Sequence, residues 1–109
     1  LMEQEYMKPI KVQITKKDIQ DGWQWSYARL VHGPKPWLVE VRHQHCPVAI
    51  ALKRAFKFKG VAAGTYRIEC KGKQYRTPET VSDWMSSFDY GFDVEPFEFE
   101  ITEEMVINR

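Results

Sequence analysis

The chain has 109 residues, of which 43% are hydrophobic and 28% are charged, with a formal net charge of +1. This length suits one domain, residues 1–109, with one hydrophobic core, and the composition excludes a disordered chain. No apolar run approaches the ~20 residues that span a bilayer, so we expect no membrane partner.

Charge is distributed unevenly along the chain. Residues 1–77 contain 15 Lys and Arg against 6 Asp and Glu, whereas residues 78–109 contain 1 against 9. The interpretation we favour is that strands of opposite charge neutralise each other in the fold. The alternative is a basic surface for an anion and an acidic surface for another partner. The absence of a signal-peptide pattern and a count of only two cysteines predict a reducing, cytoplasmic location.

The first predicted elements are a strand and a short helical turn. Residues 10–14 alternate apolar with polar side chains, which indicates a half-buried strand. Thr15 is a good N-cap, and Asp18 stands where the acid of a capping box belongs. Gly22 is expected to end this turn in a left-handed conformation.

Two more strands are predicted on either side of the breaker HGPKP. Residues 23–31 and residues 37–43 both alternate in side-chain character, and the Gly/Pro segment between them favours a loop. We therefore expect a β-hairpin rich in tryptophan, with a loop longer than the tightest type.

Two helices follow in the pattern. Residues 47–58 begin with a proline and place apolar side chains on one helical face, and Gly60 is expected to end this helix. The second helix opens with Thr77 as N-cap and Pro78 as its first residue, and Gly91 closes it.

The remaining segments read as strands. Residues 64–76 predict two strands around a tight turn at Lys71–Gly72, with Tyr66, Ile68 and Cys70 on one face, and residues 97–101 alternate again. Because no strand–helix–strand rhythm repeats, the fold class expected is α+β. We predict a mostly antiparallel sheet of about five or six strands with two packed helices.

A histidine and cysteine cluster raises the question of a metal or a reactive thiol. His43 and His45 are close to Cys46 in an extended segment, and Cys70 or His32 would complete four zinc ligands. Zinc sites usually show a second closely spaced ligand pair, which this chain lacks. We therefore assign no metal and favour structural histidines.

The same cysteine offers a nucleophile. Cys46 lies at a predicted helix N-terminus, where a thiolate is stabilised, and either neighbouring histidine could act as its base. No orienting third group is visible, and no phosphate loop or dinucleotide fingerprint occurs. The sequence leaves enzymatic activity open but favours a protein without it, and it predicts no cofactor.

Aromatic and basic residues give the strongest functional signal. Flat rings stack on bases, and guanidinium and ammonium groups neutralise phosphates, so the predicted hairpin suits a nucleotide or a single-stranded nucleic acid. The alternative is that the rings build the core. The candidate ligand-binding residues are Trp23, Trp25, Arg29, Trp37, Arg42, Lys53 and Arg54.

Three segments together carry a resemblance. ITKKDIQDG (14–22), CPVAIALKRAF (46–56) and FDYGFDVEPFEFEI (88–101) are similar to segments of a group of small proteins from phages and bacteria. Members often carry a second cysteine three residues before the helix cysteine, and this chain has His43 there. The resemblance implies a phage-type origin and the cytoplasm of a host cell, without implying an activity.

The function predicted from the sequence is therefore binding. The first hypothesis is a non-enzymatic protein that sequesters a nucleotide or a nucleotide-derived defence signal. The second is an inhibitor or adaptor that binds a host protein through an aromatic patch or its acidic C-terminal third. The third is a Cys/His thiol or zinc protein. The sequence is also compatible with a homo-oligomer.

Overall fold

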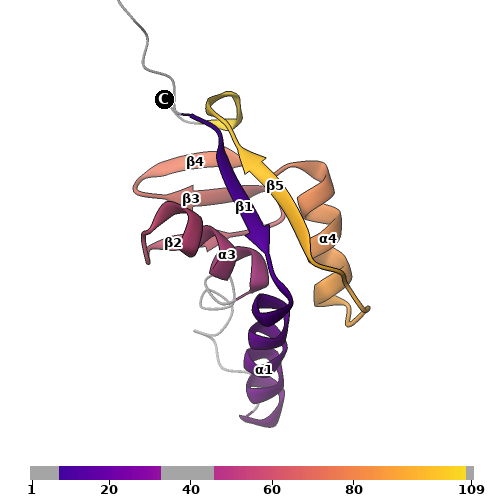
Figure 1. The fold of residues 1–109 in the computed structure, drawn as a ribbon. Helices are drawn as coiled ribbons and strands as arrows, with labels where there is room; N and C mark the ends of the chain where they lie inside the picture. The colour runs from indigo at the N-terminus through magenta and orange to yellow at the C-terminus, as the bar shows by residue number, and fades with distance from the viewer. Residues whose placement is uncertain (1–7, 33–45, 108–109) are drawn as a thin grey trace, which may run out of the picture.

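The computed structural model of the chain describes residues 8–32 and 46–107, and it describes the side chains of all of these except residues 25–32. The elements that follow are shown in Figure 1.

Two strands that are far apart in the sequence form a two-stranded antiparallel ribbon. β1 (Ile10–Ile14) pairs with β5 (Phe97–Ile101), and Val12 lies opposite Phe99 (Figure 1). Val12 is fully buried and Phe99 is partly buried, whereas the polar residues on either side of each are exposed. The alternation predicted for both strands is thus confirmed, because one face of the ribbon covers the core and the other meets solvent.

The second sheet has three antiparallel strands in the order in which they occur in the chain. They are β2 (Val61–Ala63), β3 (Arg67–Cys70) and β4 (Lys73–Arg76). The tight turn between β3 and β4 is confirmed, with Lys71 at φ 53° and Gly72 at φ 79°. Two consecutive positive φ values characterise the type I′ turn, whose twist matches that of the strands it joins.

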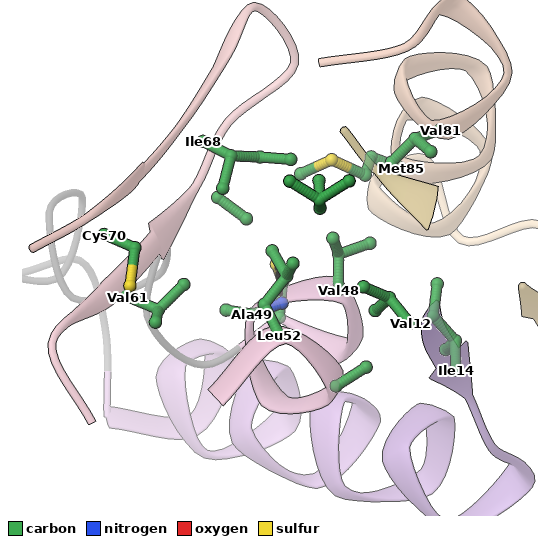
Figure 2. Close-up of a cluster of buried hydrophobic side chains, with 14 of the residues drawn as sticks. Val12, Ile14, Val48, Ala49, Leu52, Val61, Ile68, Cys70, Val81 and Met85 are labelled. Atoms are coloured by element: carbon green, nitrogen blue, oxygen red, sulfur yellow. Dashed lines mark hydrogen bonds between the residues drawn. The ribbon is translucent and has the colours of Figure 1, made fainter. Parts of the chain in front are cut away.

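Helix α3 (Pro47–Phe56) lies between the two sheets and packs against β1 and β2 (Figure 1). Its predicted apolar face is confirmed, because Val48 and Leu52 have no exposed surface. Burying a side chain of this size stabilises the fold by about 1.5–3 kcal/mol. Figure 2 shows these two side chains among core residues from both sheets and from α4, which include Val12, Ile14, Val61, Ile68, Cys70, Val81 and Met85.

The end of α3 differs from the prediction. The helix ends at a left-handed Lys57, with φ 56°, rather than near Gly60. The Lys57 cap N–H donates to the carbonyl of Lys53, which satisfies one of the carbonyls left free by the last turn.

Helix α1 (Lys16–His32) confirms the predicted capping box but is longer than the predicted turn. The capping box is confirmed, since the Thr15 N–H donates to Asp18 Oδ2 at 2.8 Å and the Asp18 N–H donates to Thr15 Oγ1 at 3.2 Å. The helix does not end at Gly22, however, and is 17 residues long in total. A Cβ at Gly22 would lie 2.7 Å from Cδ of Pro47, so this position needs glycine for close helix packing and not for a turn.

The predicted strand at residues 23–31 is therefore wrong. Its alternating tryptophan and tyrosine residues resemble a strand, but the described part of α1 turns Ile19 and Gly22 into the core at helical spacing. Contacts with α3 override the local β-propensity of these aromatic residues. The second strand of the predicted hairpin, residues 37–43, lies outside the described residues.

Helix α4 (Glu79–Asp89) follows the three-stranded sheet and buries the face that its sequence predicts, formed by Val81, Met85 and Phe88. Gly91 follows the helix with φ 86°, which confirms its role at the helix end.

The described chain ends along the edge of β4. After β5, the short 3₁₀ helix η1 (Glu103–Met105) turns the chain back, and Val106 forms an isolated antiparallel bridge with Tyr75. The Ile107 N–H donates to the carbonyl of Gln74 at 2.7 Å. This segment covers part of an edge that would otherwise leave backbone groups unpaired.

The fold class is α+β, as predicted. The described residues form two antiparallel sheets, of two and three strands, instead of the single larger sheet expected. They also contain three α-helices rather than two, because α1 replaces the predicted strand. Within the described residues, no helix has both the length and the apolar character needed to span a bilayer.

Candidate functional site

Within the described residues, helix α1 takes the place of the first strand of the predicted aromatic and basic hairpin. Trp23 lies within α1 and is 37% exposed, and its ring centroid is 4.5 Å from that of Phe88 in α4. This ring is thus partly a packing element, as the alternative interpretation supposed. Trp25 and Arg29 also lie in α1, but their side chains are not among those described. Trp37 and Arg42 lie outside the described residues.

Arg54, a predicted phosphate ligand, is bound to a carboxylate of the protein itself. Its Nη1 and Nη2 donate to the two oxygens of Asp18 at 3.0 and 2.7 Å, and Nη2 also donates to the carbonyl of Gln13 at 2.7 Å. The interaction ties α3 to the start of α1 and the end of β1. Lys53, the preceding candidate, is partly buried in the last turn of α3.

Asp18 remains ionised in this setting although it is only 3% exposed. Burial alone would raise its pKa, but the hydrogen bonds from Arg54 and Thr15, with the charge of Arg54, hold the pKa below the ordinary value of 3.8. The arrangement is a bidentate pair that stabilises the fold, and it leaves Arg54 with fewer donors for an external anion.

The cysteine candidate acts as a helix cap. Cys46 is buried, and its Sγ accepts a hydrogen bond from the Ala49 N–H at 3.4 Å. The second cysteine, Cys70, is also buried. Burial raises the pKa of its thiol against a smaller opposing effect of Lys71, which disfavours the ionised form. Among the described residues, no cluster of three or more His, Cys, Asp or Glu side chains could hold a metal ion, and the two histidines before Cys46 lie outside these residues.

A different set of charged residues surrounds an open pocket of about 750 Å³ at the start of α4. We call it the α4 pocket. Its lining comes from the ends of the β3–β4 hairpin, the first turn of α4 and the segment around η1: Tyr66, Arg67, Arg76, Thr77, Pro78, Glu79, Ser82, Glu104, Met105 and Ile107.

The hairpin register places two arginines of this pocket side by side. Because the turn occupies only two residues, Cys70 pairs with Lys73, and Arg67 pairs with Arg76 three positions further along. Directly opposite residues share one face of a sheet, with Cβ atoms about 4.5–5.5 Å apart. Two guanidinium groups therefore extend from neighbouring points on the exposed face of the three-stranded sheet.

The charges of these arginines are not compensated by ion pairs among the described residues. Arg67 Nη1 donates to Gln74 Oε1 at 3.1 Å, which is a neutral partner. None of the ion pairs among the described residues includes Arg67 or Arg76. Glu79 and Glu104 also line the pocket, but neither forms an ion pair with these arginines. Like charges directly opposite on a sheet destabilise it, so an anion between the arginines would be favoured.

The start of α4 adds donors to this pocket. The predicted N-cap, Thr77, uses its hydroxyl to donate to the carbonyl of Gly64 at 2.7 Å, and the structure places the N-cap at Pro78 instead. Pro78 provides no side-chain cap. Backbone N–H groups in a first turn carry partial positive charge, and here they have no capping side chain.

Tyr66 provides an aromatic ring at the edge of the pocket. It is 84% exposed and precedes β3, whereas Ile68 and Cys70, with which it was predicted to share a face, are buried. The Thr77 N–H donates to its carbonyl at 3.1 Å, which holds its backbone beside the start of α4.

Comparison with known proteins finds no matching family model, no matching curated protein and no matching solved structure. The resemblance to small phage and bacterial proteins therefore stays a prediction.

Proposed function

We propose that this protein binds a phosphate-bearing ligand with a flat ring, of the nucleotide class, in the α4 pocket and without transforming it. The observation that carries the proposal is the cross-strand pairing of Arg67 with Arg76 at the wall of the pocket. The phosphate would lie between the two guanidinium groups and near the uncapped first turn of α4.

Other groups of the pocket suit the rest of a nucleotide. The exposed Tyr66 ring offers a stacking surface for a base. Glu79 and Glu104 offer carboxylate oxygens that accept hydrogen bonds from amino or hydroxyl groups. A volume of about 750 Å³ lies within the roughly 300–1,000 Å³ of small-molecule sites.

This site replaces the one predicted from the sequence but keeps the same ligand chemistry. The resemblance to phage proteins extends the proposal to a nucleotide-derived signal of host defence. A test panel should therefore contain AMP, ATP and a cyclic dinucleotide, with adenosine as the control that lacks phosphate.

The first measurement is thermal unfolding with each compound. A ligand that binds only the folded state raises the melting temperature, so at least one phosphorylated compound should do so and adenosine should not. Chromatography after incubation should return the nucleotide intact. A panel without any thermal shift would contradict the proposal, and turnover would contradict its non-enzymatic part.

The Arg76→Gln variant gives a sharper test because it changes two properties in opposite directions. Removing one of two opposed charges should stabilise the unliganded protein by about 0.2–1 kcal/mol. The same change should weaken nucleotide binding about tenfold or more, because a charge-assisted hydrogen bond contributes about 1.5–3 kcal/mol.

Lys73→Gln is the matched control. It removes one positive charge from the same strand but at a position opposite Cys70 and outside the pocket lining. Its affinity should stay close to that of the unmodified protein. Equal weakening by both variants would show that only the overall charge matters and would reject this site.

A further inference from the structure

The segment after α4 lies at the C-terminal end of that helix, whereas the α4 pocket is lined by residues at the start of the helix (Figure 1). This segment contains two exposed aromatic residues. We call residues 90–95 the aromatic loop. Tyr90 is 81% exposed and Phe92 is 64% exposed, the second and third highest values among the large hydrophobic residues described. Exposed aromatic residues grouped in one short loop are a common feature of protein-binding surfaces.

The backbone of the aromatic loop is fixed by hydrogen bonds. The Phe92 N–H donates to the carbonyl of Ser87, and the Gly91 N–H donates to the carbonyl of Phe88, both at 3.0 Å. These two bonds and the left-handed Gly91 form a Schellman motif. At the other end, Trp84 Nε1 donates to the carbonyl of Glu95 at 2.8 Å. The rings are therefore presented from an ordered segment.

The motif leaves Phe92 without its usual intramolecular contact. In a Schellman motif the residue at this position commonly packs on an apolar side chain three residues before the helix cap. That position is Ser87 here, which offers only a short polar side chain. The exposure of Phe92 thus follows from the sequence of the helix end and not from disorder of the loop.

The charges of the aromatic loop indicate the chemistry of a partner. Asp93 and Glu95 are exposed, and neither forms an ion pair with a described residue. The last turn of α4 contains no basic residue. Negative charge near a helix C-terminus is unfavourable because the helix dipole is negative there, so these acids do not serve the stability of α4.

We propose that the aromatic loop is a docking site for a basic, arginine-rich segment of another protein. Guanidinium groups of that segment would stack on the rings of Tyr90 and Phe92 and pair with the carboxylates of Asp93 and Glu95. Charge complementarity selects this occupant, because the loop combines rings with negative charge only. The proposal is independent of nucleotide binding in the α4 pocket.

The test uses a fluorescently labelled peptide of alternating arginine and leucine as the probe, with binding followed by fluorescence anisotropy. The full chain should bind it saturably, and added salt should weaken the binding. The Tyr90→Ser/Phe92→Ser variant keeps every charge and should bind at least tenfold more weakly. Asp93→Asn/Glu95→Gln should also weaken binding.

Two controls make the outcome specific. Tyr66→Ser removes a similarly exposed tyrosine at the α4 pocket and should leave peptide binding unchanged. Arg76→Gln should also leave it unchanged, which separates this site from the proposed nucleotide site. Circular dichroism confirms that each variant is folded.

Two results would overturn the proposal. If the charge variant weakens binding but the Ser variant does not, the peptide is attracted by negative charge alone and the rings have no role. If light scattering shows a dimer that Tyr90→Ser/Phe92→Ser converts to a monomer, the occupant of the loop is a second copy of this chain.

Discussion

Replacing Arg54 with methionine tests the ion pair that ties α3 to the start of α1. Methionine keeps an aliphatic stem but removes both donors to the Asp18 carboxylate. Breaking a buried pair costs about 3–5 kcal/mol. The Arg54 side chain is 52% exposed, so water replaces part of what is lost, and we expect a loss of about 2 kcal/mol.

Urea unfolding at pH 7 measures this loss, and a thermal scan should show a melting temperature roughly 10 °C lower. Lys17→Met is the control, since it breaks a pair with Asp21 in which the Lys17 side chain is 80% exposed. Such a surface pair contributes about 0.3–0.5 kcal/mol. A loss below about 0.5 kcal/mol for Arg54→Met would refute the role given to the buried pair.

The pH dependence gives a second check on the same pair. The pKa of Asp18 is lowered in the fold, so its contribution is present above the unfolded value of 3.8 and is lost as pH falls through the lower folded value. Without Arg54, the carboxylate loses its guanidinium hydrogen bonds and its charge partner, so its pKa is lowered less. The stability gap between the two proteins should therefore narrow as pH falls from neutral towards 3.8 and below, and a constant gap would contradict the reasoning.

Two further predictions concern backbone positions. Gly22→Ala should destabilise by about 1–3 kcal/mol in urea unfolding, because the added Cβ meets Pro47, although helix propensity alone predicts a gain; Gln20→Ala on the exposed side of α1 should cause no loss. Lys57→Gly should stabilise by about 0.5–1 kcal/mol, because φ is 56° at this helix end and glycine adopts that conformation without strain; a loss of stability would contradict the strain assigned to Lys57.

Elements with a sustained period or a strong cap were predictable from the sequence. β1 and β5 alternate with period two, and α3 and α4 bury a face with helical spacing. The strand β2 was not predicted, because Val61–Ala63 is too short to show a period. The extent of α1 was mispredicted because the function of Gly22 depends on Pro47, which is distant in the sequence.

The candidate site was predictable only in part. A two-residue turn at Lys71–Gly72 is readable from the sequence, and counting outward from it places Arg67 opposite Arg76. The pocket itself requires η1 and α4 to meet the end of this hairpin, and no local pattern encodes that meeting. The predicted hairpin instead drew attention to Trp23, whose ring packs against α4.

The pairing of β1 with β5 has a consequence for synthesis on the ribosome. Gln13 and Glu98, which face each other across this ribbon and share a hydrogen bond, are 85 residues apart in the chain. β1 is therefore synthesised long before β5, and its edge stays unpaired until β5 is available. Until then, only part of the core covers Val12 and Ile14. Pairing between strands so distant in the sequence slows folding, and the unpaired edge of β1 favours association between nascent chains until the β1–β5 ribbon closes.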